Sequence, residues 1–126
     1  MNKIIIKTVP HKDHRYETVG DWYRIATGEL VIEVSAELSP KEVLLVAIHE
    51  LIEVSLCEDR GISIESVEDF DKEFEAKRQP GNTEEPGDQP EAPYHKEHVF
   101  SECIERLMAR ELNVNWDQYT KHVTDL

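Results

Sequence analysis

Cysteine is scarce in this chain. Cys57 and Cys103 are the only two, and they lie far apart in the sequence. Two cysteines without close spacing do not make the disulfide framework of a small secreted domain, so we expect a reducing, cytoplasmic environment. Long apolar runs are also missing. The N-terminal segment MNKIIIKTVP has too short an apolar stretch for a signal peptide, and no segment approaches the length of a membrane span.

Basic residues are few as well. The 126 residues include 14 lysines and arginines against 27 aspartates and glutamates, which gives a formal net charge of −13. Nonspecific binding to a phosphate backbone needs a basic surface, so we expect no nucleic-acid partner. The acidic charge favours solubility and a protein or peptide partner, and it leaves the oligomeric state open.

The composition that remains fits a single globular domain over residues 1–126. Apolar residues make up 39% and charged residues 33% of the chain, as in soluble domains. Within the strand region, residues 1–35, the predicted strands cover residues 3–9, 15–25 and 29–34. The last two form a hairpin around Gly28. About three predicted helices follow, over residues 39–61, 64–77 and 94–112. We therefore predict an α+β protein with a small antiparallel sheet of about three strands.

Two further segments are neither strand nor long helix. Residues 79–93, QPGNTEEPGDQPEAP, contain four prolines and two glycines, which exclude a helix or a central strand. This acidic segment is either a flexible loop or an ordered lid over a site. In the tail, residues 113–126, Trp116, Tyr119 and Val123 predict a short amphipathic turn that docks on the body of the domain.

The clearest helix begins at Ser39. Serine caps the helix, Pro40 takes its first position and Glu42 completes a capping box, while Gly61 offers a left-handed stop. Apolar side chains point in nearly every direction between residues 43 and 56, which is typical of a buried helix. The middle of this helix, AIHELIEVSL, nevertheless carries ionisable residues. Burying them is costly unless a partner compensates for their charge.

His49 and Glu53 lie on one face of this helix, one turn apart, with Glu50 beside them. Zinc peptidases use this geometry in the HExxH motif, with two ligands four residues apart and the intervening glutamate as general base. Here Glu53 stands at the second ligand position, and a carboxylate also binds zinc. A zinc ion, or another divalent cation, would compensate the buried charges. The alternative is a metal-free hydrogen-bonded pair of His49 and Glu53 in a groove.

A third ligand is expected from residues 94–105, YHKEHVFSECIE. His98 and Glu102 form another pair four residues apart, and His95 is a further candidate. The apolar face of this helix is predicted to consist of Val99, Phe100, Cys103, Ile104 and Leu107. His98 and Glu102 point largely away from that face, so a solvated helix flank is the alternative. Cys57 extends the stripe of His49 and Glu53, although buried cysteines are usually structural.

The other histidines and two aromatic residues are not assigned to the site. His11, His14 and His122 lie in polar or terminal stretches, where surface positions are expected. Trp22 and Tyr119 are expected to serve the core.

The hairpin ending in ELVIEVS and the capped HELIE helix together resemble the minimal core of zincin-type metalloproteins. The chain is also similar to small phage- and prophage-encoded proteins of unknown function. Those proteins carry an H-E-L-x-E helix and a later P-G-D-x-P-x-A-P-Y-x-x-E-H segment, here Pro86 to His98. The zincin resemblance implies that His49 is a metal ligand and Glu50 the general base, whereas Glu53 replaces the second histidine of that family. The phage pattern favours His98 as third ligand and places the protein in a bacterial host.

The leading hypothesis is a small zinc protein of the phage type that catalyses metal-assisted hydrolysis. Zinc would lie among His49, Glu53 and His98, with Glu50 taking a proton from water. The substrate stays open. The alternative is a non-catalytic protein-binding or host-interaction factor with a structural metal or none.

The number of ligands would separate the enzyme from the non-catalytic protein. A closed site, with Cys57 or His95 as fourth ligand, would favour the non-catalytic protein. A third hypothesis pairs Glu50 and Glu53 with Glu102 and Glu105 in a magnesium site for nucleotide pyrophosphate hydrolysis. All-helical folds of that type lack the strand-rich first third of this chain, so it ranks last.

Overall fold

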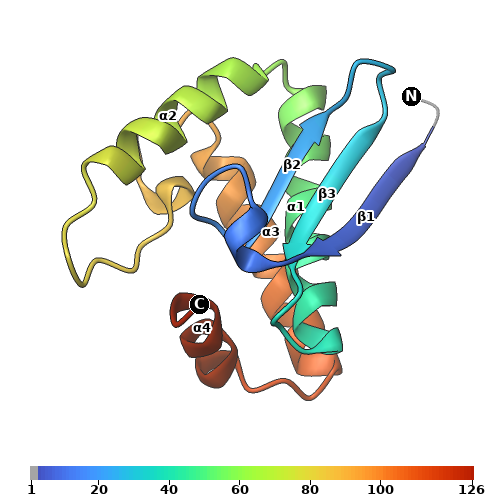
Figure 1. The fold of residues 1–126 in the computed structure, drawn as a ribbon, viewed down its shortest axis with the longest axis vertical. Helices are drawn as coiled ribbons and strands as arrows, with labels where there is room; N and C mark the ends of the chain where they lie inside the picture. Colours follow the sequence, from blue (N-terminus) through green and yellow to red (C-terminus); the bar gives the residue numbers. More distant parts are fainter. Residues whose placement is uncertain (1–2) are drawn as a thin grey trace.

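A computed structural model describes residues 3–126 of the chain. A three-stranded sheet packs there with four α-helices (Figure 1). The strands are β1 (Ile4–Val9), β2 (Gly20–Arg24) and β3 (Leu30–Ser35). The helices are α1 (Pro40–Asp59), α2 (Ile64–Ala76), α3 (His95–Glu111) and α4 (Trp116–Thr124). The predicted α+β class is confirmed, and the tail forms a complete helix, α4, where only a turn was expected.

The sheet is mixed, with strand order β1-β3-β2. β2 and β3 form the predicted antiparallel hairpin, whose turn contains Gly28 at φ 89°. β1 instead runs parallel to β3, with Ile4 opposite Leu30, so the prediction of an antiparallel sheet is wrong on this side. The connection between β1 and β2 carries the chain past the position of β3. A local apolar pattern identifies a strand but does not specify its neighbour.

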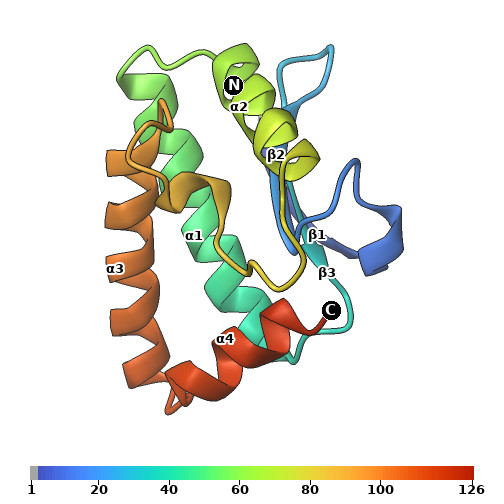
Figure 2. The same ribbon diagram turned by 90° about the vertical axis from the view of Figure 1, so that its left-hand side faces the viewer.

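Helix α1 lies between the sheet and α3 (Figure 2), which explains why its sequence is apolar all round. The inner face of β3, formed by Leu30, Ile32 and Val34, is fully buried. The helix begins with the predicted capping box of Ser39 and Glu42, and Gly61 follows its end at φ 70°. Its third-turn residues are therefore held between two packed layers.

Helix α3 turns a polar side toward α1, so its predicted orientation is wrong. The buried residues of this helix are Glu97, His98, Ser101, Glu105 and Ala109. Phe100 and Leu107, which were expected to face the core, are 50% and 57% exposed. Polar side chains occupy the interface because each has a specific partner; Arg60, for example, donates a hydrogen bond of 2.6 Å to Glu97.

The acidic proline-rich segment, residues 79–93, lies against the helices. Arg78 donates hydrogen bonds to the carbonyl oxygens of Asn82 and Glu84, and the 3₁₀ turn η2 (Pro86–Asp88) packs on α2 and α3. The segment therefore has the position expected of a lid. Among residues 3–126, no helix is both long enough and apolar enough to cross a membrane.

Candidate metal centre

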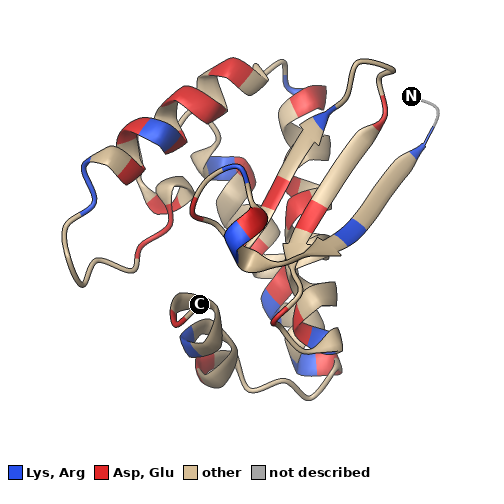
Figure 3. Cartoon of the chain, viewed as in Figure 1, with Lys and Arg blue, Asp and Glu red and all other residues tan. Residues whose placement is uncertain are grey.

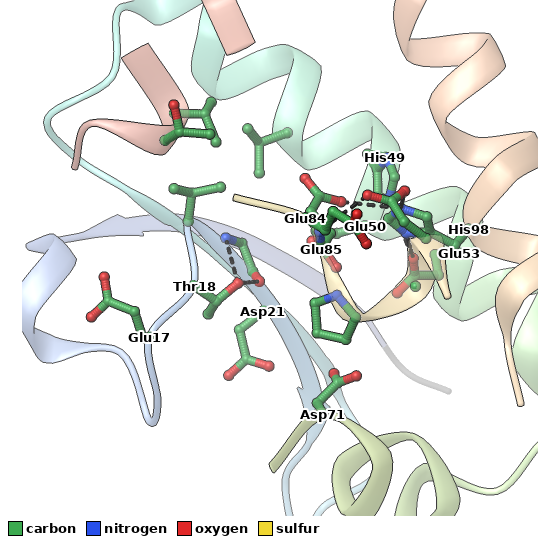
Figure 4. Close-up of a pocket in the computed structure, with 18 of the residues that line it drawn as sticks. Glu17, Thr18, Asp21, His49, Glu50, Glu53, Asp71, Glu84, Glu85 and His98 are labelled. Atoms are coloured by element: carbon green, nitrogen blue, oxygen red, sulfur yellow. Dashed lines mark hydrogen bonds and ion pairs between the residues drawn. The ribbon is translucent and has the colours of Figure 1, made fainter. Parts of the chain in front are cut away.

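Two packed helices bring three potential metal ligands together. His49 and Glu53 lie one turn apart on α1, and His98 lies on α3; the three residues are only 7%, 6% and 3% exposed. Nε2 of His49 lies 3.2 Å from both Oε2 of Glu53 and Nδ1 of His98, and the latter two atoms are 3.0 Å apart. Figure 4 shows these side chains meeting at one place, with Glu50 beside them.

The other nitrogen of each ring faces a carboxylate. Nδ1 of His49 lies 2.8 Å from Oε1 of Glu105, and Nε2 of His98 lies 3.1 Å from oxygens of both Asp88 and Glu85. A neutral imidazole carries one N–H group, which in this arrangement donates a hydrogen bond to the carboxylate behind the ring. The facing nitrogens then present lone pairs toward each other and toward Glu53. In that tautomer, a positive charge between the three acceptors would offset their repulsion in this buried space.

The size of this triangle fits a small divalent cation. Zinc binds histidine nitrogen at about 2.0–2.1 Å and carboxylate oxygen at about 2.0–2.2 Å. Two ligand atoms of a tetrahedral ion are then about 3.3 Å apart, close to the observed separations of 3.0–3.2 Å. Two imidazoles and one carboxylate also form one of the ligand sets found in catalytic zinc sites.

The pKa values show how strongly the centre attracts positive charge. Burial disfavours the charged form of His49, but hydrogen bonds to Glu105 and Glu53 raise its pKa well above 6.5. The pKa of His98 is raised as well, because Asp88 and the glutamates around it outweigh burial. Burial opposes ionisation of Glu53, yet the two histidines lower its pKa to about 2. These shifts indicate that the centre favours positive charge, which either protons or a metal ion can supply.

Glu50 lies next to this group but outside it. Its side chain borders the pocket described below, and no hydrogen bond to its carboxylate comes from any residue in the described range 3–126. Burial and the negative charge of Glu53 raise the pKa of Glu50 well above its ordinary value. Space for the side chain comes from Gly20 on β2, where a Cβ atom would lie 2.7 Å from Oε1 of Glu50. A free carboxylate with a raised pKa suits a general base.

Trp22, Tyr119 and Asp88, which the sequence did not assign to the site, support the ligands, and so does Glu105, which it assigned only to the magnesium alternative. Nε1 of Trp22 donates a hydrogen bond of 3.2 Å to Oε1 of Glu53. The Tyr119 hydroxyl donates one of 2.5 Å to Glu105, which links α4 to His49 through that glutamate. Asp88 holds His98. Carboxylates behind ligating histidines fix the ring orientation and increase metal affinity.

The proline-glycine-aspartate turn η2 fits closely over His98. A Cβ atom at Gly87 would overlap Cγ of the His98 ring, so only glycine allows this contact. The neighbouring Asp88 then reaches Nε2 of His98. In the sequence, the Pro86-Gly87-Asp88 turn motif shortly before His98 was the signal that could have predicted these contacts.

The secondary candidates lie near the centre without joining it. Nδ1 of His95 donates a hydrogen bond of 2.9 Å to the Gly87 carbonyl oxygen. Glu102 borders the pocket, and Cys57 is fully buried, where burial raises the pKa of its thiol to about 12. Within residues 3–126, the possible ligand groups are His49 with Glu53 and His98, and a second group of Glu85, Asp88 and His98. Neither group combines Glu50 and Glu53 of α1 with Glu102 and Glu105 of α3, as the magnesium hypothesis requires.

The histidines outside the centre are less exposed than expected. His11 and His14 are half-buried, and both rings approach the buried hydroxyl of Ser35, at 2.8 and 3.0 Å. They therefore fix the connection after β1 and belong to no possible ligand group of the described residues. His122 pairs with Glu42 at the start of α1.

A pocket of about 660 Å³ opens beside the candidate metal centre. Its walls come from β2 and the connection before it, from all four α-helices, and from residues 82–88. The acidic residues that border it are Glu17, Asp21, Glu50, Glu53, Glu68, Asp71, Glu75, Glu84, Glu85, Asp88, Glu102, Glu105 and Asp117. Figure 3 shows how acidic positions predominate on α2 and along the neighbouring loop. The basic residues of the lining are Arg15, Arg78 and Lys121, so acidic side chains predominate around the pocket.

Comparisons of the chain with protein-family models, with curated proteins and with solved structures found no match. The resemblances to zincin-type metalloproteins and to phage proteins therefore stay predictions.

Proposed function

We propose that the chain is a zinc-binding protein that acts as a metal-dependent hydrolase. The observation that carries this proposal is the convergence of His49 Nε2, Glu53 Oε2 and His98 Nδ1 within 3.2 Å of one another. Three protein ligands leave a fourth position of a tetrahedral ion for water or substrate, as in catalytic zinc sites. Another divalent cation with the same ligands would serve the same chemistry.

The chain's own residues would divide the work. His49, Glu53 and His98 hold the ion, which supplies Lewis acidity when bound. Glu50 accepts a proton from water in the pocket and passes it on to the leaving group. Glu105 and Asp88 keep the two imidazoles oriented. The acid-rich pocket favours a protein or peptide substrate with basic side chains.

Glu50→Gln tests the catalytic part of the proposal, because it removes the base and leaves all three ligands in place. With a panel of fluorogenic peptides as probe, we expect hydrolysis by the zinc-loaded variant to fall about 10²–10⁴-fold. Its zinc content should stay unchanged. Glu91→Gln, at an exposed position in the same loop region as η2, is the matched control and should hydrolyse normally.

Two results would change the assignment. Undiminished hydrolysis by Glu50→Gln would remove this glutamate as base. Stoichiometric zinc in a wild-type protein that hydrolyses no peptide would favour the non-catalytic binding factor.

We also propose a cytoplasmic location, because both cysteines are free thiols, as in a reducing compartment.

A further inference from the structure

The outer side of α3 carries an apolar stripe that no part of the described chain covers. Phe100, Cys103 and Leu107 are exposed along it, and Ile104 is half-buried at its edge. Lys96 and Glu111 stand at its two ends. Figure 2 shows that this helix forms the outermost layer, on the side of α1 opposite the sheet. Exposed apolar surface of this kind marks interaction sites in soluble proteins.

The spacing of these six residues gives a narrow stripe. At about 100° per residue, they fall within about 100° of arc around the helix. The successive steps of four and three residues from Lys96 to Phe100, Cys103 and Leu107 match the spacing of a helix that packs on another helix. The stripe runs nearly the full length of α3, from residue 96 to residue 111.

The stripe is complementary to itself in the antiparallel direction. A two-fold axis between Cys103 and Ile104 places Phe100 opposite Leu107 of the second copy. The same axis places Lys96 opposite Glu111 of that copy, twice in each pair of molecules. Neither charged side chain has an ion-pair partner within residues 3–126. A set of residues that maps onto itself under a two-fold rotation is what an isologous interface requires.

We propose that α3 binds a second copy of this chain, with the two α3 helices antiparallel. The self-complementary order of apolar and opposite charges favours a second copy over an unrelated partner. The stripe carries one lysine and one glutamate, so the contact adds no net charge despite the −13 of each chain. An interface of two single helices is small, so we expect association at micromolar or higher concentrations.

Sedimentation velocity over about 1–500 μM chain tests the proposal directly. The wild type should shift from monomer to dimer within that range. Leu107→Glu should weaken self-association at least about tenfold, because it places a carboxylate in the apolar contact. Leu44→Glu is the matched control, since Leu44 is an exposed leucine on α1, and it should dimerise like the wild type. Thermal unfolding would verify that both variants are folded.

A charge exchange provides an independent test. Lys96→Glu and Glu111→Lys should each weaken the dimer by about tenfold, because each creates two like-charge contacts. The double variant should recover wild-type association. A wild type that stays monomeric to about 500 μM, or a double variant that does not recover, would overturn the proposal. So would equal loss of association in Leu107→Glu and Leu44→Glu.

Discussion

Nε2 of His49 and Nδ1 of His98 face each other at 3.2 Å across the interface of α1 and α3, with ring centroids 4.8 Å apart. Both atoms also approach Oε2 of Glu53. The three atoms can share protons in hydrogen bonds, and the same arrangement suits a cation placed between them. A shared cation would compensate the buried ionisable residues of the apolar helix segment AIHELIEVSL, which is the role that we propose for zinc.

Glu105→Gln should weaken zinc binding by about 10–100-fold. The carboxylate of Glu105 orients the His49 ring and makes it a stronger ligand, and an amide does so less well. Competition with a chromogenic chelator would measure the change in affinity. Glu111→Gln, an exposed position on the same helix, should bind zinc like the wild type. Equal affinities for Glu105→Gln and Glu111→Gln would argue against the proposed orienting role.

Gly87→Ala should impair the centre through a steric contact. The new methyl group would overlap the His98 ring, so either that ring or η2 has to shift, at a cost of about 1–3 kcal/mol. We expect lower stability in urea and weaker zinc binding. Gly81→Ala is the contrast: its φ of 85° strains an alanine, but a Cβ there has open space around it. That variant should lose stability and keep its zinc affinity.

The metal-free protein should be more stable at about pH 6 than at about pH 9. The pKa values of His49 and His98 are raised in the folded state. Their stabilisation is therefore fully present below the unfolded value near 6.5 and is lost as pH rises through the folded pKa. Urea unfolding of chelator-treated protein at both pH values measures this difference. Zinc affinity should change in the opposite direction, since protons compete for the same nitrogens.

Three carboxyl groups near the histidines, Glu50, Glu53 and Asp71, also bear on this pH dependence. Asp71 acts in the same direction as the histidines, because burial raises its pKa to about 7. Glu50 acts in this direction too, because burial and the charge of Glu53 raise its pKa. A pH dependence that persists when Asp71→Asn is combined with Glu50→Gln therefore belongs to the histidines. The pKa of Glu53 is lowered to about 2, so its stabilisation is present above about pH 4.5 and lost as pH falls toward 2. Stability that rises from pH 6 to pH 9 would contradict the assignment.

Local patterns were enough to predict much of the fold. Ser39, Pro40 and Glu42 specified the start of α1, and Gly28 specified the hairpin, because caps and turns depend on neighbouring residues only. The pairing of His49 with Glu53 followed from helical spacing. The parallel pairing of β1 with β3 could not be predicted, because it depends on the path of the whole chain between them.

The orientation of α3 shows why the rest of the site was harder to predict. Apolar residues usually face the core, and this rule placed Phe100 and Leu107 inside and turned His98 away from the core, although the phage resemblance favoured His98 as third ligand. In the structure the interface is polar instead, since His98 meets Glu53 and Asp88 while Glu105 meets His49. These partners come from distant segments, so no periodicity within α3 could identify them.

Metal content by elemental analysis of untagged, zinc-supplied protein tests the central claim most directly. We predict about one zinc ion per chain in the wild type and loss of most of it in His98→Ala. His122→Ala, a histidine paired with Glu42 away from the centre, should retain the metal. A wild type without bound metal, or equal zinc in the wild type and His98→Ala, would contradict the assignment of His49, Glu53 and His98 as a metal centre.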